Sequence, residues 1–249
     1  MSMTLSKKKR PKREDKQLDG SIKVEAEVFD RKSLISLSTL IEGKFFDTVE
    51  GLISRGKEAN VFLAKKKDEY FAVKIYRIET GAFTHIHSYI DGDKRFEGAA
   101  NSRMQIAMTF ARKEHGNLKI AQKGKVRVPI PVKFRRNILI TKFLGENGLR
   151  YPQLFEIGSE KPEVDLQSLL FEIKKLYKAG LVHSDLSEYN VLMTEDGPYL
   201  IDFAQAVPLS HPAARAFLER DVRNILHYFE KKYKIRKEKE EVLKWIKGD

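Results

Sequence analysis

The sequence predicts an α+β fold in which two lobes enclose a cleft. Short apolar runs bounded by turn residues dominate the first half of the chain and are typical of strands. Long apolar stripes of helical period dominate the second half. The 249 residues, 41% of them hydrophobic, are enough to bury a sizeable core.

The composition narrows the class of protein. The chain has no cysteine, which excludes disulfides and thiolate zinc sites. No apolar run approaches the length of a membrane span, and the N-terminus is too charged to contain a signal-peptide core. We therefore expect a soluble, cytoplasmic protein with no membrane partner. The net charge of +12 favours association with a polyanion such as RNA.

Much of this charge lies at the two ends of the chain. Residues 1–20 lack an apolar pattern and include the basic run 7–13, so we expect a flexible basic tail followed by one domain over 21–249. A second basic run, 231–237, follows a predicted helix. For both runs, binding to a partner and simple solvation are equally compatible with the sequence.

The first half is expected to form a sheet and two helices. Ser33 is a candidate N-cap for a helix whose apolar stripe comprises Leu34, Leu37, Leu40 and Ile41. Strands are expected at 49–53, 60–64 and 70–76, a charged loop at 65–69, a helix at 103–115, and extended segments at 126–132 and 137–143. The stretch 77–102 is long for a connection inside a compact domain, which favours a functional loop.

The loop between the first two strands follows part of the G-x-G-x-x-G-x-V spacing of kinase phosphate loops. Gly56 holds the central glycine position, and Ser54 and Ala59 hold the outer ones. The candidate nucleotide-binding residues are Ser54, Gly56, Lys57, Glu58, Ala59 and Val61. One glycine in a hairpin is in most proteins only a turn, so this motif gains weight from the residues that follow it.

Lys74 lies inside an apolar strand and points to the face opposite Val73 and Ile75. An exposed strand face would explain this lysine, but so would a role in holding nucleotide phosphates, which requires a carboxylate partner. Glu114 is our choice of partner, because it shares an apolar helix face and a carboxylate is rare there without a cation. Glu97 is a less favoured alternative, since the glycine that follows it indicates a loop.

The second half is predicted to be mainly helical. Residues 145–148 are expected to connect the lobes, and the backbone around Lys142, Phe143 and Leu144 is a candidate contact for an adenine edge. Asp165 is expected to open a helix that ends at Gly180. Further helices are expected from about Pro212 and around 242–246. Their apolar stripes are interpreted as core.

Three acid or amide side chains stand around a predicted hairpin. Asn190 begins a strand over 190–193, a turn follows at 195–197, and the return strand over 198–201 ends just before Asp202. Asp185 lies in the loop before the first strand. Phosphoryl transfer needs such a group, with a carboxylate to orient or deprotonate the attacking hydroxyl and oxygen ligands for a nucleotide-bound magnesium ion. Chance acids in a polar loop are the weaker interpretation.

These motifs together resemble the RIO family of atypical serine/threonine protein kinases, most of all its type-1 branch. The resemblance covers about residues 22 to 235. It depends on six stretches, 53–61, 72–76, Gly92-Asp93-Lys94-Arg95-Phe96, 181–190, 201–207, and His211-Pro212 with 217–221.

The resemblance implies a trimmed two-lobed kinase fold. The N-lobe, about 21–142, would hold an antiparallel sheet and a helix, and the C-lobe, about 143–249, would be mainly helical. ATP would bind beneath 54–61, contacted by Lys74, Lys142 and Leu144. Asp185 would be the catalytic base, and Asn190 and Asp202 would hold magnesium or manganese. The aspartate at the position of Asp202 is also implicated in this family as a phosphoryl acceptor, and family members act in small ribosomal subunit maturation.

Departures from ordinary protein kinases are informative. The arginine that precedes the catalytic aspartate in many kinases is Ser184 here, and Ala204 stands in place of the glycine of Asp-Phe-Gly. Ser187 stands where many kinases carry a lysine. Too few residues follow Asp202 for an activation segment and the usual substrate-binding helices. Two alternatives to a RIO-type kinase or ATPase are a small-molecule phosphotransferase and a non-enzymatic, nucleotide-gated RNA or ribosome binder.

Overall fold

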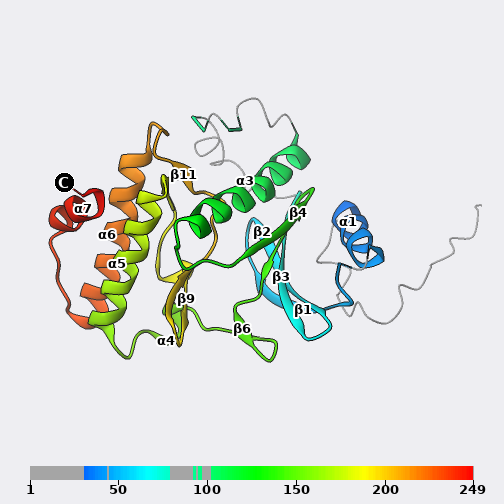
Figure 1. Cartoon of the computed structure of the whole chain (residues 1–249), viewed down its shortest axis with the longest axis horizontal. Helices are drawn as coiled ribbons and strands as arrows, with labels where there is room; N and C mark the ends of the chain where they lie inside the picture. Colours follow the sequence, from blue (N-terminus) through cyan, green and yellow to red (C-terminus); the bar gives the residue numbers. More distant parts are fainter. Residues whose placement is uncertain (1–30, 44, 79–91, 94, 97–101, 249) are drawn as a thin grey trace, which may run out of the picture.

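The computed structural model describes residues 31–43, 45–78, 92–93, 95–96 and 102–248. The predicted tail 1–20 and Glu97 lie outside these residues. The first part of the chain forms an antiparallel five-stranded sheet in the order β1-β2-β3-β5-β4 (Figure 1). The strands are β1 Thr48–Arg55, β2 Ala59–Lys66, β3 Glu69–Tyr76, β4 Pro131–Arg135 and β5 Ile138–Lys142. The strands predicted at 49–53, 60–64 and 70–76 are therefore confirmed, and β1 is longer at both ends than expected. The extended segment predicted at 126–132 overlaps β4 only at its last two residues.

A helix packs on each face of this sheet. α1, Arg31–Glu42, buries Leu37 and Leu40 against Val73, Ile75 and other strand residues. Ser33 lies inside α1, so its prediction as the N-cap is wrong. α3, Arg103–Lys123, lies on the opposite face (Figure 1).

α3 continues past the predicted end at residue 115. Gly116 does not stop it, because the next turns still bury Leu118 and Ala121. The C-cap is Gly124, and the Ser102 side chain caps the N-terminus by accepting a hydrogen bond from the Gln105 amide.

The second part of the chain is mainly helical, as predicted, with α5 Pro162–Lys178, α6 Ala214–Tyr233 and α7 Lys239–Lys247 (Figure 1). α5 begins at Pro162 with Lys161 as N-cap, so Asp165 lies in its first turn and does not open it. The predicted connection at 145–148 is a small hairpin of β6 Gly145–Glu146 and β7 Leu149–Arg150, followed by the short helix α4 Leu154–Ile157. A large core of α5, α6 and α7 side chains supports this lobe.

Short strands position the functional loops of the C-lobe. β8 Leu181–Val182 pairs with β11 Val207–Pro208, and the 3₁₀ turn η3 Glu188–Asn190 leads into β9 Val191–Thr194, which pairs with β10 Gly197–Leu200. The chain then runs directly from Asp202 through β11 to α6, so no activation segment separates them. The predicted α+β fold, with an antiparallel sheet in the first part and a mainly helical second part, is thus confirmed. No helix in the described ranges is long and apolar enough to cross a membrane.

Candidate active site

A cavity of about 460 Å³ lies between the two lobes. All residues predicted to bind nucleotide or metal, or to act in catalysis, line it. They are Ser54, Gly56, Lys57, Glu58, Ala59, Val61, Lys74, Glu114, Lys142, Leu144, Asp185, Asn190 and Asp202. The size is within the usual range for a small-molecule site.

The tip of the β1–β2 hairpin forms the roof of this cavity. The Gly56 amide donates to the Ala59 carbonyl at 2.9 Å and closes a tight turn. A Cβ atom at Gly56 would lie 2.8 Å from the same carbonyl oxygen, so only glycine fits this turn without a shift. The turn holds Lys57 and Glu58 at the edge of the cavity.

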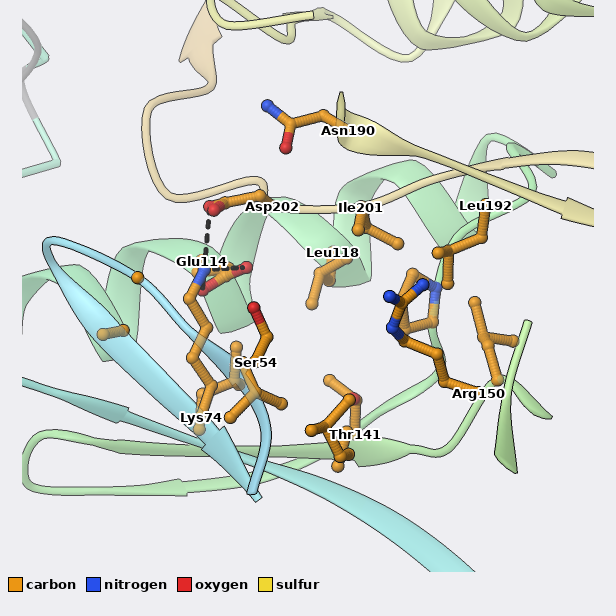
Figure 2. Close-up of a pocket in the computed structure, with 18 of the residues that line it drawn as sticks. Ser54, Lys74, Glu114, Leu118, Thr141, Arg150, Asn190, Leu192, Ile201 and Asp202 are labelled. Carbon is orange, nitrogen blue, oxygen red and sulfur yellow. Dashed lines mark hydrogen bonds and ion pairs between the residues drawn. The ribbon is translucent and has the colours of Figure 1, made fainter. Parts of the chain in front are cut away.

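Lys74 joins the two lobes. It lies on β3, and its Nζ atom is 3.0 Å from a carboxylate oxygen of Glu114 on α3 and 2.8 Å from Oδ1 of Asp202 (Figure 2). Burial alone would lower the pKa of Lys74, but the charges of Asp202 and Glu114 raise it above its usual value, so the ammonium form persists. The predicted pair of Lys74 with Glu114 is present.

Glu114 is the centre of a buried network. Its side chain accepts hydrogen bonds from Lys74, the Tyr76 hydroxyl and the Phe203 backbone amide. Burial raises the pKa of Glu114 above its usual value, and the positive charge of Lys74 offsets only part of this increase. Through these bonds one carboxylate orients both the lysine and the chain just after Asp202.

The loop that carries Asp185 is held from below by α6. The carboxylate of Asp221 accepts hydrogen bonds from the Ser184 amide at 2.8 Å and the Leu186 amide at 3.0 Å. Arg220 donates to the Ser184 carbonyl, and Asn224 donates to the Leu186 carbonyl. Burial raises the pKa of Asp221 to about 7 despite the two amide donors. None of these three α6 residues was predicted to act in the site.

Asp185 and Asn190 contact each other at the mouth of the cavity. The Asn190 Nδ2 atom donates to the Asp185 carbonyl at 2.7 Å and lies 3.4 Å from its carboxylate. Partial removal of the carboxylate from water, together with the negative charge of Asp202, raises the pKa of Asp185 to about 6. The side chain is nevertheless exposed to the cleft, so a bound substrate can reach it.

Asp202 has φ of 64°, an unusual conformation for a residue other than glycine. Burial would raise the pKa of Asp202, but the charge and hydrogen bond of Lys74 lower it, so the residue is a carboxylate at neutral pH. His183 lies beneath it, with Nε2 2.9 Å from the Ile201 carbonyl, to which it donates. Burial lowers the pKa of His183 to about 4 and keeps the ring neutral.

Comparison with known proteins identifies the family. A family model described as the RIO domain matches residues 60–242. The chain belongs to the RIO family of serine/threonine protein kinases. It is 40% identical to the RIO-type serine/threonine-protein kinase Rio1 of Haloferax volcanii over 83% of this chain and 72% of that protein. It is also 40% identical to Rio1 of Methanocaldococcus jannaschii over 85% of this chain and 73% of that protein.

A solved structure agrees on the fold. The crystal structure of the Rio2 kinase-ADP/Mg²⁺-phosphoaspartate complex from Chaetomium thermophilum is similar with a TM-score of 0.64 and 22% identity, covering 86% of this chain and 66% of that one. The comparisons support neither the small-molecule phosphotransferase nor the non-enzymatic binder. The resemblance inferred from the sequence is therefore confirmed.

The RIO chain offers two oxygen ligands for a cation, from Asn190 and Asp202 (Figure 2). The Asn190 amide nitrogen is engaged by the Asp185 carbonyl, which leaves its oxygen for a metal. No group of three or more His, Cys, Asp or Glu side chains able to hold a metal occurs in the part of the chain that the structure describes. A pair of oxygen ligands fits magnesium or manganese, which keep waters and phosphate oxygens as further ligands.

The inner part of the cavity is apolar and suits a flat base. Its walls were not predicted, because these residues look like ordinary core in sequence. They include Ala72, Leu118, Leu139, Leu192 and Ile201. The ammonium of Lys142 pairs with Glu69 at 2.7 Å, so the side chain of Lys142 is not directed at a base. The Lys142 and Phe143 amides already donate to Ile130 and Tyr70.

Arg150 is a further lining residue that the sequence did not indicate (Figure 2). Glu156 holds its guanidinium through two hydrogen bonds of 2.8 and 2.6 Å. The bonds to Arg150 lower the pKa of Glu156 to about 2. This pair places a fixed cation beside the cavity.

Proposed function

We propose that this RIO kinase transfers the γ-phosphoryl group of ATP to a serine or threonine hydroxyl or to water, with Mg²⁺ or Mn²⁺ as cofactor. The observation that carries the proposal is the bridge from Lys74 to Glu114 and Asp202, which brings a fixed cation and a carboxylate from opposite lobes to one point. Phosphoryl transfer needs little covalent help from the protein and depends on such positioning.

Each residue has a role in this reaction. Lys74 holds the α- and β-phosphates, and Glu114 fixes Lys74. Asp185 orients the attacking hydroxyl and accepts its proton, for which a pKa of about 6 is well matched to neutral pH. Asn190 and Asp202 would hold the metal ion, which would neutralise charge at the phosphates. Gly56 and the rest of 54–61 cover the nucleotide, and the apolar wall binds adenine.

We further propose that Asp202 accepts the phosphoryl group in part of the cycle. A carboxylate oxygen would attack the γ-phosphorus, and the bond to the β–γ bridging oxygen would break, which releases ADP and leaves an acyl phosphate. The name of the solved Rio2 complex includes a phosphoaspartate, which supports this step. Protein labelled from γ-³²P-ATP should lose the label in neutral hydroxylamine, and Asp202→Asn protein should take up no such label.

The test of the main proposal compares Asp185→Ala with wild-type protein. The variant should lose nearly all ATP turnover, while ADP binding in the presence of Mg²⁺, measured by calorimetry, stays within about twofold, because Asp185 acts on the nucleophile. Near-normal turnover in the variant would remove Asp185 from the mechanism.

The cellular setting is proposed to be small ribosomal subunit maturation in the cytoplasm, with precursor RNA as a partner. This proposal is supported by a long basic stretch, because no acidic residue lies between Glu114 and Glu146. α3 and the edge strand β4 lie side by side there (Figure 1). α3, β4, the link between them and the turn after β4 expose Lys119, Lys123, Lys125, Arg135 and Arg136.

RNA binding can be tested by charge reversal. Lys119→Glu with Lys123→Glu should weaken binding to small-subunit RNA and reduce its salt dependence, because fewer counterions are released. Lys244→Glu with Lys247→Glu on α7 makes the same change of charge elsewhere and serves as the control. Equal effects of the two double variants would mean that only net charge matters and not this surface.

A further inference from the structure

The segment 92–96 is one of the six stretches that mark the family, yet the reaction described above does not use it. Asp93 is fully buried. Arg95 binds its carboxylate through two bonds, Nε to Oδ1 at 2.8 Å and Nη2 to Oδ2 at 2.7 Å. Such a paired contact fixes the plane of the guanidinium. Burial would raise the pKa of Asp93, but the bonds from Arg95 lower it, so the pair is ionic.

The remaining arm of Arg95 reaches α3. Its Nη1 atom donates to Oδ1 of Asn117 at 3.0 Å. This bond settles the orientation of the Asn117 amide, whose nitrogen then donates to the Phe203 carbonyl at 2.9 Å and the Ala206 carbonyl at 2.8 Å. Asn117 is fully buried, so both donor hydrogens are used without competition from water.

A second α3 side chain binds the same loop. The buried Lys113 donates from Nζ to the Ala204 carbonyl at 3.1 Å. Burial lowers the pKa of Lys113 to about 7, while the charge of Asp93 raises it. The charge of Asp93 therefore favours the charged form of Lys113 and also pairs with Arg95.

The chain after Asp202 is thus held at three carbonyls, 203, 204 and 206, and at the Phe203 amide, which donates to Glu114. All four anchors come from α3. Asp202 itself has a positive φ, a conformation that costs of the order of 1 kcal/mol and persists only when neighbours hold it. The direction of its carboxylate therefore depends on these anchors.

The other end of the segment is also fixed. Gly92 has φ of 103°, and a Cβ atom there would lie 3.1 Å from Cδ of Pro212 and 3.2 Å from Nε2 of His211. Only glycine allows this close approach. The segment consequently contacts the start of α6 at one end and α3 at the other.

We propose that Arg95 and Asn117 are positioning residues that set the carboxylate of Asp202 for the metal-bound nucleotide. Arg95 orients Asn117, and Asn117 holds the loop that presents Asp202. Asp93 keeps Arg95 in place. The inference rests on the proposed role of Asp202 as a metal ligand.

The test measures how much Mg²⁺ improves ADP binding, by calorimetry with and without the ion. In Asn117→Ala and Arg95→Ala, this improvement should fall by about tenfold, which corresponds to about 1.4 kcal/mol. Binding of ADP without Mg²⁺ should change by less than about twofold, because the base and Lys74 contacts stay in place. Arg95→Lys keeps the charge but cannot bridge Asp93 and Asn117, so it should behave as Arg95→Ala does.

Asn137→Ala is the matched control. Asn137 is also a fully buried asparagine that donates to a backbone carbonyl, that of Tyr76 at 2.7 Å, but this bond joins it to the end of β3 and not to the chain after Asp202. It should lower the unfolding temperature as Asn117→Ala does and leave the Mg²⁺ effect unchanged. A loss of the Mg²⁺ effect in this control would mean that general destabilisation is the cause and would overturn the inference.

The Asp202→Asn variant tests the metal role of Asp202 separately from the positioning role of Arg95 and Asn117. If this variant retains the full Mg²⁺ effect, the metal role of Asp202 is wrong and the positioning role falls with it. If it loses the effect while the Asn117 and Arg95 variants keep it, only the positioning role is overturned. Arg95→Lys, at a partly exposed side chain, gives the answer even if Asn117→Ala does not fold.

Discussion

The carboxylate of Asp221 holds the main chain on both sides of Asp185, through amide bonds of 2.8 and 3.0 Å. The residue between these two bonds is the proposed base, and the preceding residue, Ser184, has φ of 66°. A left-handed conformation at serine is unfavourable and needs support from its surroundings. Asp221 on α6 therefore fixes the backbone of the loop that carries Asp185.

Replacing Asp221 should separate turnover from binding. In Asp221→Ala, two buried amides lose their acceptor, and we expect a loss of stability of about 2–4 kcal/mol. We also expect kcat to fall at least about tenfold while ADP affinity changes little, since the nucleotide contacts lie elsewhere. Urea unfolding, steady-state kinetics and calorimetry measure the three quantities. Glu219→Ala, which removes only an exposed pair with Arg215, should leave all three unchanged.

Breaking the bridge between the lobes should weaken the use of ATP. Lys74→Met leaves the carboxylates of Glu114 and Asp202 close together without their shared cation. We expect kcat/KM for ATP to fall by about 100-fold or more. Glu114→Gln keeps the shape and should cost about tenfold, since Lys74 retains Asp202. A larger loss in Glu114→Gln than in Lys74→Met would contradict the order of roles given to them.

The pH dependence of turnover should follow the protonation of Asp185. The base acts when it is unprotonated, and its pKa is raised to about 6 by the surrounding protein and by Asp202. We therefore expect kcat/KM to rise as pH increases through about 6 and to level off above about 7. An acidic limb centred near 4, the ordinary value of an exposed aspartate, would show that the site does not perturb Asp185.

The free energy of unfolding below neutral pH should depend on the protonation of His183. Its pKa is lowered to about 4 in the folded state from about 6.5 in the unfolded state, so the unfolded chain binds the proton more tightly. Stability from this residue is therefore full above pH 6.5 and is lost as pH falls toward 4, by of the order of 3 kcal/mol. Urea unfolding of wild-type protein and His183→Gln between pH 7 and 5 measures the difference. An equal dependence on pH in both would exclude His183 as its source.

Local patterns were sufficient to predict the parts of the site that depend on a single element. The alternation around Lys74 predicted which strand face it occupies, and the helical spacing from Ala107 to Glu114 predicted the buried carboxylate. The hairpin that carries Asn190 and Asp202 followed from its turn residues and apolar strands. These signals depend on neighbours close in sequence, so one chain is enough to see them.

The supporting residues could not be predicted because their partners are distant in sequence. Asn117 bonds to Phe203 and Ala206, and Asp221 to Ser184 and Leu186, across 35 to 89 positions. The only available signal was a polar residue within an apolar helical stripe. Helix ends were also misplaced, at Ser33, which lies inside α1, and at residue 115. α3 continues past residue 115 because its next turns still bury Leu118 and Ala121.

The β9–β10 hairpin has a consequence for how this site tolerates change. Its ladder pairs Leu200 with Val191, and the Ile201 amide donates to the Asn190 carbonyl at 3.0 Å, so strand register sets the spacing of the two proposed metal ligands, Asn190 and Asp202. The turn at Glu195 and Asp196 lies at the opposite end and is exposed. Insertions at that tip should therefore be neutral, which makes it a suitable place for a fluorescent label or an affinity tag. A slip of the ladder by one position would instead turn every side chain of a strand to the other face and separate Asn190 from Asp202.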